Sequence, residues 1–501
     1  MTIHLGWIDI AVLLMYLTSA VVVGLVVSGR GKNLETYLLG DRDLPWWAIL
    51  GSIVATETST ATVISVPGKA FGPDGMRFLQ LAMGYCIGRV IIVRVLLPLY
   101  FQGQLFTAYQ VLERRFGGLT KRAASLLFLV TRNLSDALRL FLTAIVLQRL
   151  GGLDFVSSVI AMGLVTIFYT FFGGMRSVVW NDCIQFVVYV LGGVAAVFVI
   201  ASQVPGGWNE ILQYGSENER FQIFDFRPLL SYPFTFWAGL IGGAVLTIGT
   251  HGTDHMMVQR YLSARSQNDA GRAIVLSGFV VLIQFALFLF IGAELAAFYA
   301  RHPEILESWK QLAAEKRWTT DDVFPHFIVN FFPANTGLIG LILAAILAAA
   351  MSTLSSSLNS SASALVNDFY VSARKTEASS EHLFFLTRWL TVAFGIIQIG
   401  IAIWARQLEK AVVDNALTIA GFSAGLLLGV FSLGVLTKRA GQASALIGGA
   451  VGLAVLLWLQ FIAPRSDIRI AWPWFALIGA TATYATGCVV ALFAPRQGTV
   501  A

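Results

Sequence analysis

The stretch GSIVATETSTATVISVPGKAF (51–71) decides the predicted fold, because it is apolar enough to cross a membrane and is interrupted by threonine, serine and one acid. A second stretch, GLIGGAVLTIGTHGTDHMMVQRYL (239–262), carries a similar interruption of glycine, threonine, histidine and aspartate. Membrane helices are broken in this way where unwound backbone carbonyls bind a cation and half-helix ends face a substrate. Close packing at Gly249 and Gly252 is the alternative explanation for the second interruption.

The composition places both stretches in a polytopic membrane protein. Hydrophobic residues make up 56% of the 501 residues and charged residues only 12%, and the mean hydropathy is +0.73, whereas soluble domains carry about 25% charged residues. Apolar windows near the ~20 residues needed to cross hydrocarbon fall at 7–28, 46–70, 76–99, 122–148, 154–173, 178–202, 234–258, 273–298, 336–364, 384–404, 411–436, 443–463 and 470–494. We therefore expect an all-α protein with about thirteen transmembrane helices.

The two interrupted stretches are the second and seventh spans of this series. An odd number of crossings reverses orientation, so spans two to six and seven to eleven are predicted to form two inverted five-helix repeats. The expected division is a first helix and loop (1–45), the first repeat (46–203), an external loop (204–233), the second repeat (234–436) with external loop 299–335, and two further helices (437–501).

The basic residues predict the orientation of these spans. Clusters in short loops on one side comprise Arg114/Arg115, Arg260/Arg265/Arg272, Arg374/Lys375 and Lys438/Arg439. The positive-inside rule then puts the amino terminus outside and the carboxyl terminus in the cytoplasm. The net charge of +6 reflects this topology and indicates no nucleic-acid partner. We expect a multi-pass protein of the plasma membrane, in a bacterium the inner membrane, with a first helix that is retained and not cleaved.

A hydroxyl-rich run follows the apolar segment LIGLILAAILAAAM (338–351). The run STLSSSLNSSAS (352–363) holds nine hydroxyl or amide residues in twelve positions. Hydroxyls that bond back to carbonyls one turn earlier account for two or three of them. A run this dense, inside a spanning helix, indicates a surface for a hydrated or ionic guest.

Four segments resemble the sodium:solute symporter family. They are GDRDLPWWA (40–48) leading into ATETS (55–59), FFGGMRSVVWNDCIQ (171–185), GTDHMMVQRYL (252–262) and AAAMSTLSSSLNS (348–360). The resemblance implies a leucine-transporter-type inverted-repeat core that moves a small organic solute inward with Na⁺ by alternating access. A monomer in the lipid bilayer would be sufficient for this activity.

The resemblance also implies a first sodium site. Its ligands would be the carbonyls of Ala55, Thr58 and Ala349 and the hydroxyls of Ser352 and Thr353. Sodium prefers oxygen ligands, which a broken helix and uncharged hydroxyls supply without a further charge to desolvate.

An acid in the sixth span raises the question of a second ion. In some members of the family the acid that matches Asp182, with serines matching Ser352, Ser355 and Ser356, forms a second sodium site. The alternative is that Asp182 starts a helix near the interface, where the helix dipole favours a carboxylate. Glu57 matches a position that varies between acid and amide and would tune cation affinity or the local fold.

The fourth span, LVTRNLSDALRLFLTAIV (129–146), carries the candidate anchor for the solute. Arg132, Asp136 and Arg139 share one helix face, so Asp136 can neutralise one arginine and leave the other guanidinium over. Arg139 lies nearer the middle of the membrane, and a guanidinium fork suits a carboxylate. We therefore predict that Arg139 binds an anionic solute.

Polar residues near the positions that sugar transporters of the family use are Thr62, Tyr85, Thr250 and His251. The acid and serine positions that sugar members use in the third span read Ala82 and Tyr85 here. This departure favours a carboxylate-bearing solute over a neutral sugar, and a sodium/sugar symporter is the alternative.

Other classes of membrane protein fit less well. A transporter-like sensor would need a signalling domain after the spans, and a channel would show a repeated filter motif. The six histidines include a single pair at helical spacing, His251 and His255, without the acidic third ligand of a zinc protease. The three cysteines are far apart and indicate neither disulfides nor a thiolate site. The sequence therefore predicts a transporter and not an enzyme.

Overall fold

The structure is a computed structural model that describes residues 5–27, 33–151, 154–314, 318–374, 378–407, 412–466 and 468–493. The helices of the first half are α1 (Trp7–Val26), α2 (Leu34–Leu39), α3 (Trp46–Glu57), α4 (Thr60–Phe71), α5 (Leu79–Ile91), α6 (Leu97–Tyr100), α7 (Gln110–Phe116), α8 (Gly118–Gly151), α9 (Phe155–Gln203) and α10 (Gly207–Glu217). A π-helical turn, Ile92–Leu96, joins α5 to α6.

The second half begins with the π-helical turn Ala238–Gly242, which runs directly into α11. The helices are α11 (Gly243–Gly252), α12 (His255–Leu262), α13 (Gln267–Ala300), α14 (Pro303–Ala314), α15 (Val323–Phe331), α16 (Leu338–Ala364), α17 (Val371–Ala373), α18 (Ser380–Trp404), α19 (Val412–Leu436), α20 (Gln442–Phe461) and α21 (Pro473–Phe493). Among the described residues the β-structure is limited to one isolated bridge, between Leu44 and Ala264, so the all-α prediction is confirmed.

Helix length and apolar composition indicate which helices could cross a membrane. Within the described residues eight helices are long and apolar enough to cross a membrane, and a ninth span is added if the bent pair α3–α4 counts as one. Each of the thirteen predicted windows lies largely on helix, but the count of thirteen and the boundaries of the two repeats stay predictions.

The helix α9 accounts for two of those windows. Its 49 residues would be about 74 Å long if straight, more than twice the hydrocarbon thickness of about 30 Å. Gly174 interrupts it with φ of 55° and ψ of −156°. A Cβ atom there would lie 2.5 Å from the carbonyl oxygen of Tyr37 in α2. Glycine is therefore required at a turn that joins two consecutive crossings without a loop.

Both predicted interruptions are confirmed. The axis bends by 62° between α3 and α4, and α11 ends at Gly252 while α12 starts at His255. The alternative reading of close packing also holds in part, because a Cβ on Gly249 would lie 2.6 Å from the Ala424 carbonyl oxygen. The segment 239–262 therefore contains both a break between two helices and a close approach of α11 to α19 at Gly249.

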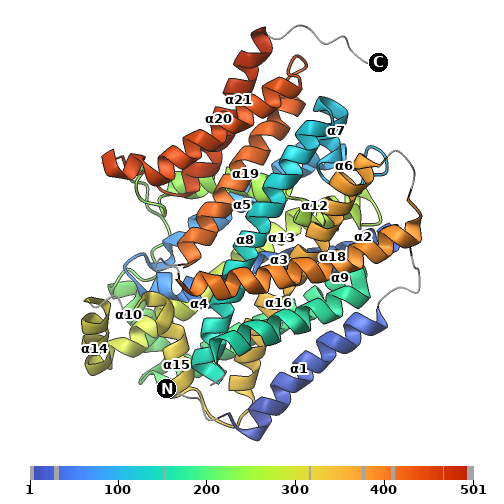
Figure 1. The fold of residues 1–501 in the computed structure, drawn as a ribbon. Coiled ribbons are helices and arrows are strands. Elements are labelled where there is room, and N and C mark those ends of the chain that lie inside the picture. The colour runs from blue at the N-terminus through green and yellow to red at the C-terminus, as the bar shows by residue number, and fades with distance from the viewer. Residues whose placement is uncertain are drawn as a thin grey trace.

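The hydroxyl-rich run lies inside α16, as predicted, and every residue of 352–363 is buried. This helix packs along α9 and α1, and Figure 1 shows α1, α9 and α16 in neighbouring positions at one side of the bundle, with α20 and α21 at the opposite side. The buried hydroxyls therefore face protein, and not lipid.

Candidate sodium and substrate site

The break between α3 and α4 leaves backbone carbonyls without their helical hydrogen-bond donors. Thr58 and Ser59 are extended, with φ/ψ of −73°/118° and −116°/170°. The Ser59 amide nitrogen lies 3.3 Å from Oγ1 of Thr62, so the Ala55 carbonyl lacks its helical donor. A carbonyl of this kind is the ligand that a sodium ion requires.

The α16 helix faces this break with its hydroxyl pair. Oγ1 of Thr353 lies 3.1 Å from the Thr56 carbonyl oxygen and 3.3 Å from the Ala349 carbonyl oxygen. Ala55, Ala349, Ser352 and Thr353 are all buried. Ser352 and Thr353 of the predicted first sodium site therefore contact α3 next to its break, and the oxygen atoms of the predicted residues fit the chemistry of a sodium ligand set.

Thr58 is held by side chains that the sequence did not single out. Its hydroxyl donates to the Val54 carbonyl at 2.8 Å and accepts from Nε2 of Gln284 at 2.7 Å. The hydroxyl of Tyr189 lies 3.1 Å away. These bonds occupy the Thr58 side chain, which leaves its carbonyl as the atom for an ion, as the resemblance implies.

Asp182 lies in the second half of α9, eight residues after the turn at Gly174, and is fully buried. It does not cap the helix there. Its Oδ1 accepts from the Ser352 hydroxyl at 2.6 Å and its Oδ2 from the Ser52 hydroxyl at 2.5 Å. The carboxylate therefore joins α9 to α3 and α16, beside the residues predicted for the first sodium site.

Arg260 provides a positive charge for this carboxylate. The loop charges predict that Arg260 lies in a short cytoplasmic loop. This prediction is wrong, because the residue lies in α12 with a side chain only 1% exposed. Its Nη2 lies 3.1 Å from Oδ2 of Asp182 and also donates to the hydroxyls of Thr56 and Ser356. Its Nε donates to Ser52 at 2.8 Å. An arginine in a spanning segment needs such a partner, but the sequence does not reveal which one.

The predicted serines divide between two roles. Ser352 donates to Asp182 and Ser356 accepts from Arg260. The hydroxyls of Ser355 and Ser356 both donate back to the Ser352 carbonyl, at 3.1 Å and 2.8 Å. Within the described part of the chain no hydrogen bond joins Ser355 to Asp182. The residues predicted for a second sodium site therefore lie close together, but Arg260 already contacts two of their oxygen atoms, Oδ2 of Asp182 and Oγ of Ser356.

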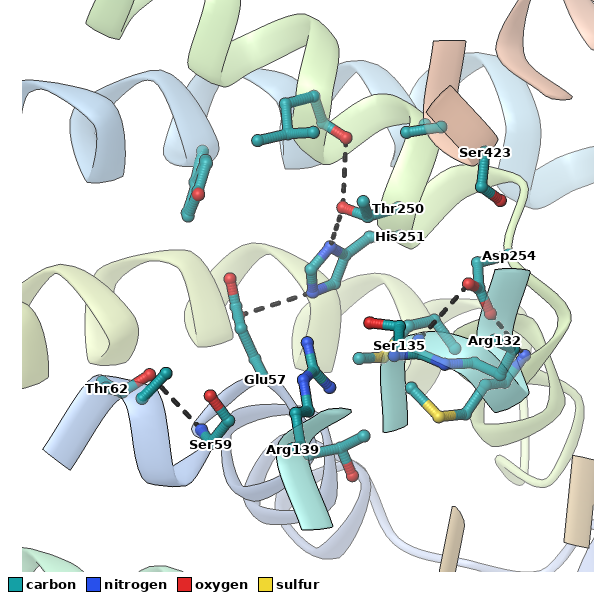
Figure 2. A pocket seen from close by; sticks show the side chains of 18 of the residues that line it. Glu57, Ser59, Thr62, Arg132, Ser135, Arg139, Thr250, His251, Asp254 and Ser423 are labelled. Carbon is teal, nitrogen blue, oxygen red and sulfur yellow. Dashed lines mark hydrogen bonds and ion pairs between the residues drawn. The ribbon is translucent and has the colours of Figure 1, made fainter. Parts of the chain in front are cut away.

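A cavity of about 190 Å³ lies beside the break and is lined by α3, α4, α5, α8, α11, α12, α13 and α19. All five residues that we predicted for substrate binding line it, namely Arg139, Thr62, Tyr85, Thr250 and His251. Figure 2 shows that the labelled side chains come from both sides of this cavity. The structure therefore brings together predicted residues from the third span, the fourth span and both broken spans.

Arg139 has spare hydrogen-bonding capacity in this cavity. Asp136 accepts from Nε and Nη2 of Arg132 at 2.8 Å each and from Nη1 of Arg139 at 3.2 Å. Arg132 also lies 3.5 Å from a carboxylate oxygen of Asp254. Because Arg132 takes most of the compensation, Arg139 retains donors for a ligand, and its side chain is 20% exposed.

A second charged group in the cavity wall is Glu57, at the end of α3. It is paired with Arg89 of α5, whose side chain is fully buried, and its Oε2 lies 3.4 Å from Nε2 of His251. Arg89 also donates to Ser277 of α13. Sequence reasoning missed Arg89, although an arginine inside an apolar span signals a buried partner.

These features are those of a helical membrane transporter with a candidate ion site and a cavity at a pair of broken helices. The profile of the sodium:solute symporter family matches residues 37–452. The chain belongs to this family. It is therefore a sodium-coupled symporter, and not an enzyme.

The sodium/sialic acid symporter SiaT of Proteus mirabilis is 29% identical over 511 residues, which cover 98% of this chain and 96% of that protein. Mouse sodium-coupled monocarboxylate transporter 1 is 29% identical, over 89% of this chain and 71% of that protein. The substrate-bound, outward-open structure of a Na⁺-coupled sialic acid symporter, which revealed a novel Na⁺ site, superimposes with a TM-score of 0.87 and 29% identity, over 98% of this chain and 99% of that chain. This similarity establishes the inverted-repeat fold and supports alternating access.

Proposed function

We propose that this symporter imports a small carboxylate-bearing solute together with sodium, and that Arg139 binds the carboxylate. The observation that carries the proposal is a guanidinium with spare donors, 20% exposed, in a cavity beside the broken helix. A guanidinium binds carboxylates through two parallel hydrogen bonds. The two relatives described above are named for sialic acid and monocarboxylates, and both are carboxylate ligands.

In this proposal the first sodium site consists of the carbonyls of Ala55, Thr58 and Ala349 and the hydroxyls of Ser352 and Thr353. The break that holds the ion also forms the cavity wall, since Thr56, Glu57 and Ser59 line the cavity. An ion that fixes the break therefore fixes part of the solute site. Because such coupling is reciprocal, sodium should raise the affinity for the solute and the solute the affinity for sodium.

A second ion is proposed beside Asp182, Ser352, Ser355 and Ser356. Arg260 already contacts this carboxylate, so a sodium ion there has to share it with the guanidinium. The remaining oxygen, Oδ1, bonds to Ser352, which also belongs to the first site. Binding of the two ions would then be coupled through Ser352.

The orientation is proposed from the loop charges, with the amino terminus outside and the carboxyl terminus in the cytoplasm of the plasma membrane, or of the bacterial inner membrane. A monomer is proposed as the transporting unit.

Uptake into proteoliposomes tests the proposed function. We expect sodium-dependent uptake of at least one member of a panel of small carboxylates that includes sialic acid and monocarboxylates, and no uptake of glucose or galactose. Sodium-driven uptake of a neutral sugar by the wild type would favour the alternative, a sodium/sugar symporter.

A further inference from the structure

Glu57 presents an oxygen atom to the solute cavity. Its contacts with Arg89 and His251 both involve Oε2, and among the described residues Oε1 has no hydrogen-bond partner. The Glu57 side chain is 13% exposed and lines the cavity. Figure 2 shows Glu57 beside His251, with Arg139 reaching into the same space from a different helix.

The position of this carboxylate is fixed by three neighbouring helices. Arg89 of α5 compensates its charge and is itself bonded to Ser277 of α13. His251 of α11 is held through Nδ1, which lies 3.2 Å from the Thr247 hydroxyl and 3.0 Å from the Thr250 hydroxyl. An acceptor held in this way loses little freedom when a ligand binds, so it is preorganised for a hydrogen-bond donor.

Glu57 and Arg139 are complementary groups in one cavity. No ion pair or hydrogen bond joins them in the described part of the chain, where Arg139 pairs with Asp136 and Glu57 pairs with Arg89 and His251. The cavity therefore offers a cationic donor at one place and a carboxylate acceptor at another. A solute that satisfies both must carry an acceptor and a donor of its own.

We infer that the solute carries a hydrogen-bond donor, an ammonium or a hydroxyl group, in addition to its carboxylate, and that Oε1 of Glu57 accepts from this donor. The inference rests on the proposed function, in which Arg139 holds the carboxylate. A solute with an apolar group next to Oε1 would leave a partly buried carboxylate oxygen unpaired. A site of this kind discriminates strongly against such analogues.

Matched pairs of acids test the inference on the wild type, where folding is not in question. Propanoate is compared with lactate and with alanine, and hexanoate with 6-aminohexanoate, as competitors of the solute taken up in proteoliposomes. Hydrogen bonds to charged groups correspond to about a ten- to hundredfold preference. We expect the donor-bearing member of at least one pair to compete about tenfold or more better than its partner. Equal competition within all three pairs, or no competition by any of these acids, would overturn the inference.

A double variant tests the role of Glu57 without stranding a buried charge. Glu57→Met together with Arg89→Met removes both charges of the pair and the carboxylate acceptor, whereas either change alone leaves its partner uncompensated. We expect the folded double variant to lose most of the donor preference. The control is Glu113→Gln with Lys121→Gln, which removes an ion pair of 2.6 Å remote from the cavity lining and should keep the preference. An unchanged preference in a folded Glu57/Arg89 variant would overturn the inference.

The failure of this inference differs from failure of the proposed function. If the symporter transports acids with and without donors equally, only the role of Glu57 fails and Arg139 keeps its assignment. If the wild type transports neutral sugars and no acid, the proposed function fails, and with it the inference.

Discussion

Nη2 of Arg260 lies 3.1 Å from Oδ2 of Asp182, and both side chains are fully buried or nearly so. The pair joins α12, the second half of one broken span, to α9. Hydroxyls of α3 and α16 complete it through Ser52 and Ser356. Both broken spans and the hydroxyl-rich helix therefore meet at one ion pair, which makes that pair the natural place to disturb coupling.

Loss of the hydroxyl pair on α16 should weaken activation by sodium. Ser352→Ala with Thr353→Ala removes two of the five proposed ligands, so the sodium concentration for half-maximal uptake should rise several-fold to about a hundredfold. The control is Ser360→Ala, whose hydroxyl bonds back to the Ser357 carbonyl at 3.2 Å and should leave sodium activation unchanged. An unaltered sodium dependence in the folded double variant would remove the first site from α16.

Asp182→Asn should lower the number of coupled sodium ions. If the carboxylate holds a second ion, the wild type has a sodium Hill coefficient above one, and Asp182→Asn brings it toward one while some transport remains. The measurement is the initial rate of uptake as a function of sodium concentration at saturating solute. Identical Hill coefficients in the two proteins would mean that Asp182 serves the ion pair with Arg260 alone.

Breaking the Arg260–Asp182 pair from one side should destabilise the protein more than removing it. Asp182→Asn or Arg260→Gln alone strands a buried charge, which costs about 3 to 5 kcal/mol when one partner of such a pair is removed. The double variant should recover part of this loss. Thermal unfolding in one detergent, measured for all four proteins, gives the coupling energy, and strictly additive effects would contradict the buried pair.

Arg139 variants should separate solute binding from sodium binding. Arg139→Lys keeps the charge but loses the planar fork, so the apparent KM for the anionic solute should rise, and Arg139→Gln should raise it further. Sodium binding without solute should stay nearly intact in both. Normal transport by Arg139→Gln would mean that Arg139 is only a structural partner of Asp136. Thr250 and His251 would then be the candidate residues for binding the solute.

The sequence predicted the features that depend on local pattern. The interruptions at 58–59 and 253–254 were visible because glycine, threonine and acids replace the apolar run. Among the cavity residues, Thr62, Tyr85, Thr250 and His251 followed from resemblance at matching positions, and Arg139 followed from its helical spacing to Asp136. Arg89 and Arg260 were missed because their meaning depends on partners remote in sequence. Arg260 and Ser52 are 208 residues apart, and only the packed helices bring them within 2.8 Å.

The turn at Gly174 limits how the sidedness of the protein can be mapped. The orientation proposed from the loop charges puts residues 174–177, between the fifth and sixth predicted spans, on the cytoplasmic side. The chain at Gly174 passes from one crossing to the next against Tyr37 with no room for a Cβ atom. A reporter cysteine, an epitope insertion or a protease site placed at this turn would disrupt the contact that it was meant to read. Accessibility experiments therefore need the segment between α10 and α11, where Arg227 and Leu230 are exposed, as their reference for the opposite face.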